Sequence, residues 1–85
     1  MQGKVIGLKR DSQFPYNGVQ YVGMEICIAF ENGFDEGVCA EKFFINDQKP
    51  VYAAVKKLNV GDEVMYQKNS YGKLADICVT RYASK

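Results

Sequence analysis

Aromatic and basic side chains lie close together in two short segments of this chain, and they are the residues best suited to bind a ligand. Residues 9–18 carry two cations and two rings in an expected loop, and Tyr21 lies just beyond them. Residues 68–73 place Tyr71 between two lysines at an expected hairpin tip. Exposed rings let nucleic-acid bases stack on them, at about 1–3 kcal/mol per base, and nearby cations bind phosphates. The pattern predicts a site for single strands that tolerates any base sequence, although each ring could instead pack in the core or a loop.

Charge is unevenly distributed along the 85 residues, although the formal net charge is only +1. Residues 21–41 contain five acidic side chains and no cation, whereas residues 1–20 and 42–85 are both basic overall. The acidic stretch includes an expected hairpin loop over residues 31–37, which would repel phosphates. We therefore expect a nucleic-acid surface to lie away from this loop, with stacking carrying much of the binding.

The composition argues against an enzyme and against a metal site. The chain contains no histidine, which removes the commonest general base and the commonest metal ligand. Its cysteines, Cys27, Cys39 and Cys78, are widely spaced and form no Cys-x-x-Cys pair, so they predict neither a zinc site nor a disulfide framework. We expect small buried thiols in a reducing cytoplasm, and no cofactor, metal or small-molecule substrate.

Five strands and one helix must position the rings and cations. Alternating or apolar runs bounded by Gly, Asn and Asp predict strands over residues 4–10, 19–30, 38–45, 63–68 and 73–82. In the first strand, Ile6 and Leu8 are expected to share a face. In the second, alternation places one set of side chains together: Val22, Met24, Ile26, Ile28 and Phe30. The adjacent Phe43 and Phe44 must face opposite ways, so one of them belongs to the core.

The hydrophobic period changes in residues 50–58, where Val51, Val55 and Leu58 recur at helical spacing. Three strands, a helix and two strands is the order of the OB-fold, a five-stranded Greek-key barrel whose closure leaves no exposed sheet edge. An SH3-like barrel is the alternative, but it places no two-turn helix between the third and fourth strands. We predict an all-β protein with one short helix, folded as a single OB-fold domain over residues 1–85.

The sequence predicts no contact with a membrane. No apolar run approaches the ~20 residues that a membrane-spanning helix needs. No apolar stretch of signal-peptide length follows Lys4. We therefore expect a cytoplasmic protein.

Four short motifs occur in an order and spacing that indicate a family. They are a lysine before an apolar strand (Lys42), Gln48-Lys49-Pro50-Val51-Tyr52-Ala53, Tyr71-Gly72-Lys73-Leu74, and Asn17-Gly18-Val19. With these motifs the chain resembles the small helix-destabilising, single-stranded-DNA-binding proteins of filamentous phages, which are OB-fold dimers that coat single strands cooperatively. The resemblance implies that Lys42 contacts phosphate and that Tyr71 stacks on a base. The arginines of that family's DNA-binding wing are absent here, where Gln20-Tyr21-Val22 stands.

We therefore predict a non-enzymatic homodimer that binds single-stranded DNA during replication or transfer of a phage or mobile element. The predicted contacts are stacking by Tyr16, Tyr21 and Tyr71 and phosphate binding by Lys9, Arg10, Lys42, Lys68 and Lys73. The sequence leaves two alternatives open. One is a protein-interaction module that uses an aromatic patch or an edge strand, and the other is an RNA-binding OB domain.

Overall fold

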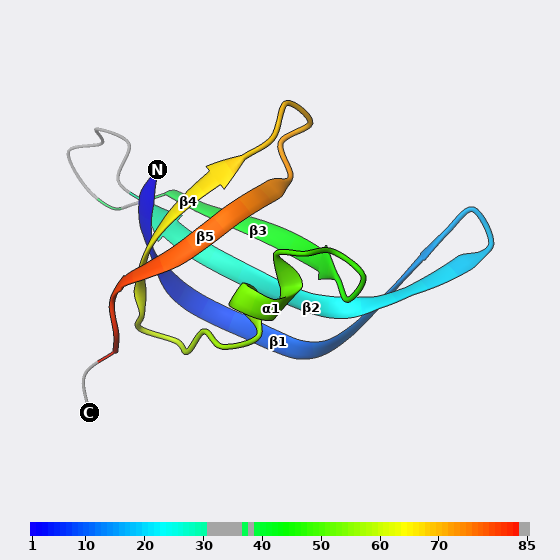
Figure 1. Cartoon of the computed structure of the whole chain (residues 1–85), viewed down its shortest axis with the longest axis horizontal. Coiled ribbons are helices and arrows are strands. Elements are labelled where there is room, and N and C mark those ends of the chain that lie inside the picture. Colours follow the sequence, from blue (N-terminus) through cyan, green and yellow to red (C-terminus); the bar gives the residue numbers. More distant parts are fainter. Residues whose placement is uncertain (31–36, 38, 84–85) are drawn as a thin grey trace.

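A computed structural model describes residues 1–30, 37 and 39–83, which form one antiparallel sheet with a short helix packed against it. The elements are β1 (Gln2–Tyr16), β2 (Val19–Phe30), β3 (Cys39–Asn46), α1 (Tyr52–Val55), β4 (Glu63–Lys68) and β5 (Leu74–Arg81) (Figure 1). The predicted mostly-β architecture, with one short helix between the third and fourth strands, is confirmed. The predicted hairpin loop over residues 31–37 lies, except for Gly37, outside the described residues.

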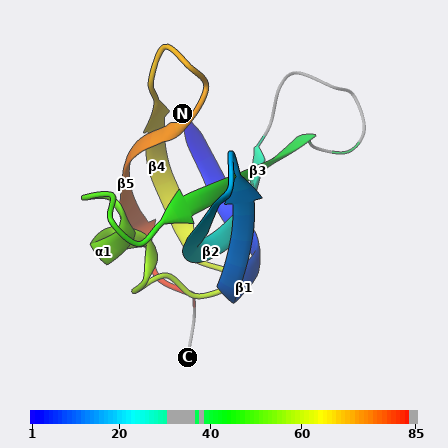
Figure 2. The same cartoon turned by 90° about the vertical axis from the view of Figure 1, so that its right-hand side faces the viewer.

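The strands follow the order β3-β2-β1-β4-β5, and every neighbouring pair is antiparallel. The central strand β1 pairs with β2 along most of its length but with β4 only over Gln2–Lys4. Figure 2 shows the sheet curling around an interior. In the part of the chain that the structure describes, β3 and β5 form no ladder with each other, so the sheet is open at these two edges. Closure into an OB-fold barrel therefore remains a prediction.

The β1–β2 hairpin projects beyond the rest of the sheet as a two-stranded wing, which comprises residues 13–22 (Figure 1). The prediction of a loop here is wrong, because the chain up to Tyr16 continues β1 and pairs with β2. Asn17 and Gly18 close the hairpin with φ angles of 52° and 75°, the two left-handed residues that a tight two-residue turn requires. Pro15 is tolerated because this part of β1 has a neighbouring strand on one side only.

A β-bulge in β1 changes which of its side chains face the core. The register shifts between Val5 and Gly7, so Ile6 has no partner of its own on β2. Val5 is fully buried and Leu8 packs against the core, whereas Ile6 is about half exposed. The predicted shared face of Ile6 and Leu8 is therefore wrong, since the extra residue interrupts the alternation between them.

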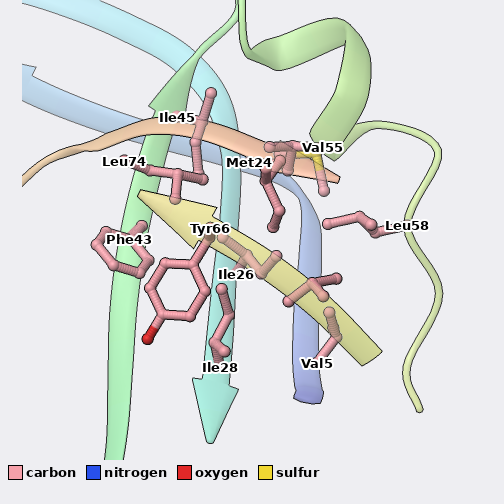
Figure 3. Close-up of a cluster of buried hydrophobic side chains, with 12 residues drawn as sticks. Val5, Met24, Ile26, Ile28, Phe43, Ile45, Val55, Leu58, Tyr66 and Leu74 are labelled. Atoms are coloured by element: carbon pink, nitrogen blue, oxygen red, sulfur yellow. The ribbon is translucent and has the colours of Figure 1, made fainter. Parts of the chain in front are cut away.

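The core fills the space between the curled sheet and α1 (Figure 3). Its side chains come from all five strands and from the helical segment: Val5, Met24, Ile26, Ile28, Phe43, Ile45, Val55, Leu58, Val64, Tyr66, Leu74 and Ile77. The predicted inward face of β2 is confirmed from Met24 to Ile28, but Val22 is exposed because it lies on the wing. Phe43 is buried and Phe44 is only partly buried, so these adjacent rings do face opposite ways.

The helix is shorter than its apolar stripe. Val55 and Leu58 are buried and Val51 packs against the core, so the predicted stripe is confirmed. The α-helical residues nevertheless extend only over Tyr52–Val55, and the N-cap residue, Val51, offers no side-chain hydrogen bond to the first turn. Packing of the stripe, rather than capping, holds this segment against the sheet.

Asp62 is a fully buried carboxylate that joins two distant segments of the chain. Its Oδ2 accepts the backbone N–H of Asn59 at 2.9 Å, and its Oδ1 accepts the N–H of Ala83 at 2.7 Å. The side chain thus connects the turn before β4 to the residues after β5.

Replacing Asp62 by alanine should lower the free energy of unfolding by about 2–4 kcal/mol, because the change leaves two buried N–H donors without an acceptor. Urea denaturation followed by circular dichroism would measure the loss. Asp11→Ala is the matched control, since its side chain is exposed and should shift the midpoint little. Equal effects of the two substitutions would show that Asp62 has no special role.

Candidate nucleic-acid interface

An open groove of about 1250 Å³ lies where three parts of the chain approach one another. It is lined by residues of the wing, by the end of β3 with the segment that follows it as far as Val51, and by the start of β5 with the turn before it. Figure 1 shows both hairpins projecting from the molecule with this connecting segment near them. Three of the predicted site residues, Tyr16, Tyr21 and Lys73, line this groove.

The wing presents an aromatic wall to the groove. Phe14 and Tyr16 are two residues apart on β1 and so share a face, and their rings stack with centroids 6.3 Å apart and planes at 12°. Tyr21 lies directly opposite Phe14 on β2, which places its ring on the same face. Phe14 also contacts Phe44 of β3, with ring centroids 5.6 Å apart. Phe14 and Tyr16 are 49% and 57% exposed, so a ligand can reach their rings.

Two lysines border the groove away from the wing. Lys49 lies in the segment before α1, and Lys73 lies just before β5. Neither forms an ion pair with any residue that the structure describes. Asp47 is the acidic residue of the lining, so the groove as a whole is weakly basic.

Sequence reasoning missed Phe14, Phe44 and Lys49 as site residues. The signal for Phe14 was its spacing from Tyr16, because two rings at alternate positions of a strand must share a face. The signal for Phe44 was its position next to Phe43. Because adjacent strand residues face opposite ways, one of the two rings had to be buried and the other had to lie outside the core. Nothing in the sequence alone distinguishes Lys49 from other surface lysines.

Lys9 and Lys42 lie outside the groove, where both face the carboxylate of Glu25 on β2. The Lys9 Nζ is 4.0 Å from Glu25 Oε2, and the Lys42 Nζ is 3.6 Å from Oε1. The Ser12 hydroxyl donates a hydrogen bond of 2.6 Å to Oε2. This hydrogen bond, together with the two lysines, holds the pKa of Glu25 below its usual value. The structure therefore brings Lys9 and Lys42 together, but both of these predicted phosphate-binding lysines pair with the carboxylate of Glu25.

Lys68 is held by an ion pair with Glu41 and does not line the groove. Its Nζ lies 2.6 Å from Glu41 Oε1, while the buried Tyr66 hydroxyl donates to Oε2 at 2.8 Å. Burial alone would raise the pKa of Glu41, but the hydrogen bonds from Lys68 and Tyr66 outweigh it and lower that pKa. Burial and the neighbouring carboxylate raise the pKa of Tyr66 well above its usual range. Lys68 thus helps to anchor a core tyrosine.

Arg10 and Tyr71 are also set apart from the groove. The Arg10 guanidinium donates to the backbone carbonyl oxygens of Lys56 at 3.1 Å and Leu58 at 2.7 Å, so it fixes the turn after α1. Tyr71 is 86% exposed at the tip of the β4–β5 hairpin and is not part of the groove lining.

Residues 1–30, 37 and 39–83 contain no group of three His, Cys, Asp or Glu side chains that could hold a metal ion. They also contain no helix of sufficient length and apolar character to cross a membrane. Searches of family models, curated proteins and solved structures give no match to this chain.

Proposed function

We propose that this protein binds single-stranded DNA in the groove, without catalysing a reaction. The observation that carries the proposal is the exposed, stacked pair of Phe14 and Tyr16, with Tyr21 beside it, on one wall of an open groove. Bases stack on such rings with about 1–3 kcal/mol each. Lys49 and Lys73, on the other sides of the groove, supply cations for the phosphates that lie between stacked bases.

The aromatic wall favours single strands over duplexes. In a duplex the bases are already paired and stacked on one another, so their faces are not available to protein rings. In a single strand they can turn outward and stack on side chains. A protein that binds through such rings stabilises the unpaired form, and this is the helix-destabilising activity that the resemblance to filamentous-phage proteins implies.

The strand order is compatible with the proposed class of protein. The order β3-β2-β1-β4-β5, with α1 between β3 and β4, would become an OB-fold barrel if the edges β3 and β5 met. We include in the proposal a homodimer that coats strands in the cytoplasm during replication or transfer of a phage or mobile element. The support for this part is the resemblance of the four motifs to the filamentous-phage proteins, which is best over residues 41–77.

Titration with oligo-dT tests the proposal, using the fluorescence of the six tyrosines in a chain without tryptophan. We expect saturable quenching at low salt, weaker binding to a duplex of equal length, and affinity that falls as salt rises. Absence of binding to oligo-dT at low salt would reject the proposal. Tighter binding to matched RNA would favour an RNA-binding domain instead, and salt-independent recovery of a protein partner without nucleic-acid binding would favour an interaction module.

A further inference from the structure

A second basic cluster lies across the first three strands of the sheet. Lys9 on β1 is the direct partner of Glu25 on β2, and Lys42 on β3 is the direct partner of Cys27, two residues further along the same face. All four residues line a surface hollow of about 200 Å³. The lysine side chains are 67% and 72% exposed, whereas that of Glu25 is 26% exposed. The ammonium groups are therefore accessible to a ligand that approaches over the carboxylate.

This cluster is continuous with the aromatic wall of the groove. Phe44 is the direct partner of Glu25 in the β2–β3 ladder and is two residues from Lys42, so the three side chains share one face of the sheet. The Phe44 ring contacts Phe14, which stacks on Tyr16. A strand whose bases stack on the wing can thus continue past Phe44 to the two lysines.

We infer that Glu25 is an internal counterion: it pairs with Lys9 and Lys42 in the free protein, and a phosphate of the bound single-stranded DNA competes with its carboxylate for both. This inference rests on the proposed function. Ser12 fixes the carboxylate by a hydrogen bond of 2.6 Å, so Glu25 stays near the lysines and continues to repel an approaching phosphate. Competition with a fixed acid, in place of simple release of salt ions, lowers both the affinity and its dependence on salt.

Neutralising Glu25 should therefore strengthen binding. We expect Glu25→Gln to bind oligo-dT about 5-fold more tightly at low salt. The substitution removes the repulsion between the Glu25 carboxylate and a phosphate bound beside it, and two unit charges about 4 Å apart interact by about 1 kcal/mol even in water. The slope of log affinity against log salt should steepen by up to about 1.4, because each freed lysine contributes about 0.7. The glutamine carbonyl can still accept the Ser12 hydrogen bond, so the fold should be retained.

Glu63→Gln is the matched control, because it removes the same charge at an exposed position of β4 that lines neither the groove nor the hollow. We expect it to bind within about twofold of the parent protein. The gain from Glu25→Gln should disappear when Lys9→Gln and Lys42→Gln are added. If the parent protein binds but the two glutamate variants behave alike, the inference is wrong and the proposed function stands. If the parent protein does not bind oligo-dT at low salt, the proposed function is wrong, and the inference that rests on it is wrong as well.

The pH dependence of the unmodified protein provides a second measurement. The charged groups that face Glu25 are Lys9 from β1 and Lys42 from β3, which form its two ion pairs. Thymine bases do not change charge between pH 3 and 5. Because the pKa of Glu25 lies below its usual value of 4.5, binding should tighten as pH falls through that lowered pKa, and the tightening should be smaller in Glu25→Gln, which lacks this carboxyl group. Identical profiles of the two proteins would overturn the inference.

The fold must be monitored in the acid range. A carboxyl group whose pKa is lowered by folding stabilises the native state above its unfolded pKa, and this contribution is lost as pH falls through the folded value. Both Glu25 and Glu41 behave in this way, so stability should decline below about pH 4.5. Circular dichroism at each pH identifies the range in which the protein is still folded, and binding is compared within that range.

Discussion

Replacing Phe14 and Tyr16 together by alanine should weaken binding to oligo-dT by about 30-fold or more at low salt. Each ring offers about 1–3 kcal/mol of stacking, and 1.4 kcal/mol corresponds to a tenfold change in affinity. Both side chains lie on the wing and are about half exposed, so the loss of their ring pairs with each other and with Phe44 should lower the free energy of unfolding by only about 1–3 kcal/mol. Fluorescence from the remaining tyrosines, or anisotropy of a labelled oligomer, would measure the affinity.

Tyr82→Ala is the control for this double substitution. Tyr82 is 70% exposed but does not line the groove, so its removal tests whether exposed rings outside the groove also stack on DNA bases. We expect unchanged affinity for this variant. Full affinity in the double variant would show that the aromatic wall is not the binding site, and an equal loss in Tyr82→Ala would show that stacking is not localised to the groove.

Replacing Gly23 by alanine should destabilise the fold by about 3 kcal/mol or more, the largest effect we expect for one methyl group. A Cβ at this position would lie 1.9 Å from the carbonyl oxygen of Ile45 and 2.8 Å from its carbonyl carbon. Both atoms belong to the backbone of β3, which is paired to β2 at this point, so they cannot move without disrupting the ladder. Urea denaturation would show a lower midpoint or an unfolded protein.

Gly7→Ala provides the comparison, because a Cβ there would meet only the Cβ of Cys27 at an ordinary 3.6 Å. Gly7 is also in a strand, so the two substitutions differ mainly in the space available. We expect a change of less than about 1 kcal/mol at Gly7. Normal stability of the Gly23 variant would mean that β2 and β3 adapt more readily than their pairing indicates.

Much of the fold can be predicted from the local spacing of apolar residues, because this spacing indicates which side chains are buried. The alternation from Met24 to Ile28 predicted an inward face, and the spacing of Val55 and Leu58 predicted a stripe packed on the core. The sequence could not predict the bulge at Ile6, because a register shift depends on how β1 meets its partner strand. It also overestimated the helix, since spacing records which residues face the core but not how many of them keep helical hydrogen bonds.

The candidate site was predictable only in part, because residue type shows what a side chain can do but not which partner it meets. Tyr16, Tyr21 and Lys73 line the groove as part of a pattern visible in the sequence. Arg10 instead binds carbonyl oxygens 46 and 48 residues away, and Lys68 binds a carboxylate 27 residues away. Such long-range partners are set by the topology of the sheet, which the local patterns do not contain.

The short ladder between β1 and β4 has a consequence for how the chain folds. Its three residue pairs join positions roughly 60 residues apart, so a long loop must close before any of them can form. The β1–β2 hairpin, by contrast, closes around a two-residue turn and needs only neighbouring residues. Its rings can therefore be in place early, while the opposite side of the groove is assembled only when the C-terminal hairpin docks, in the slowest part of the conformational search.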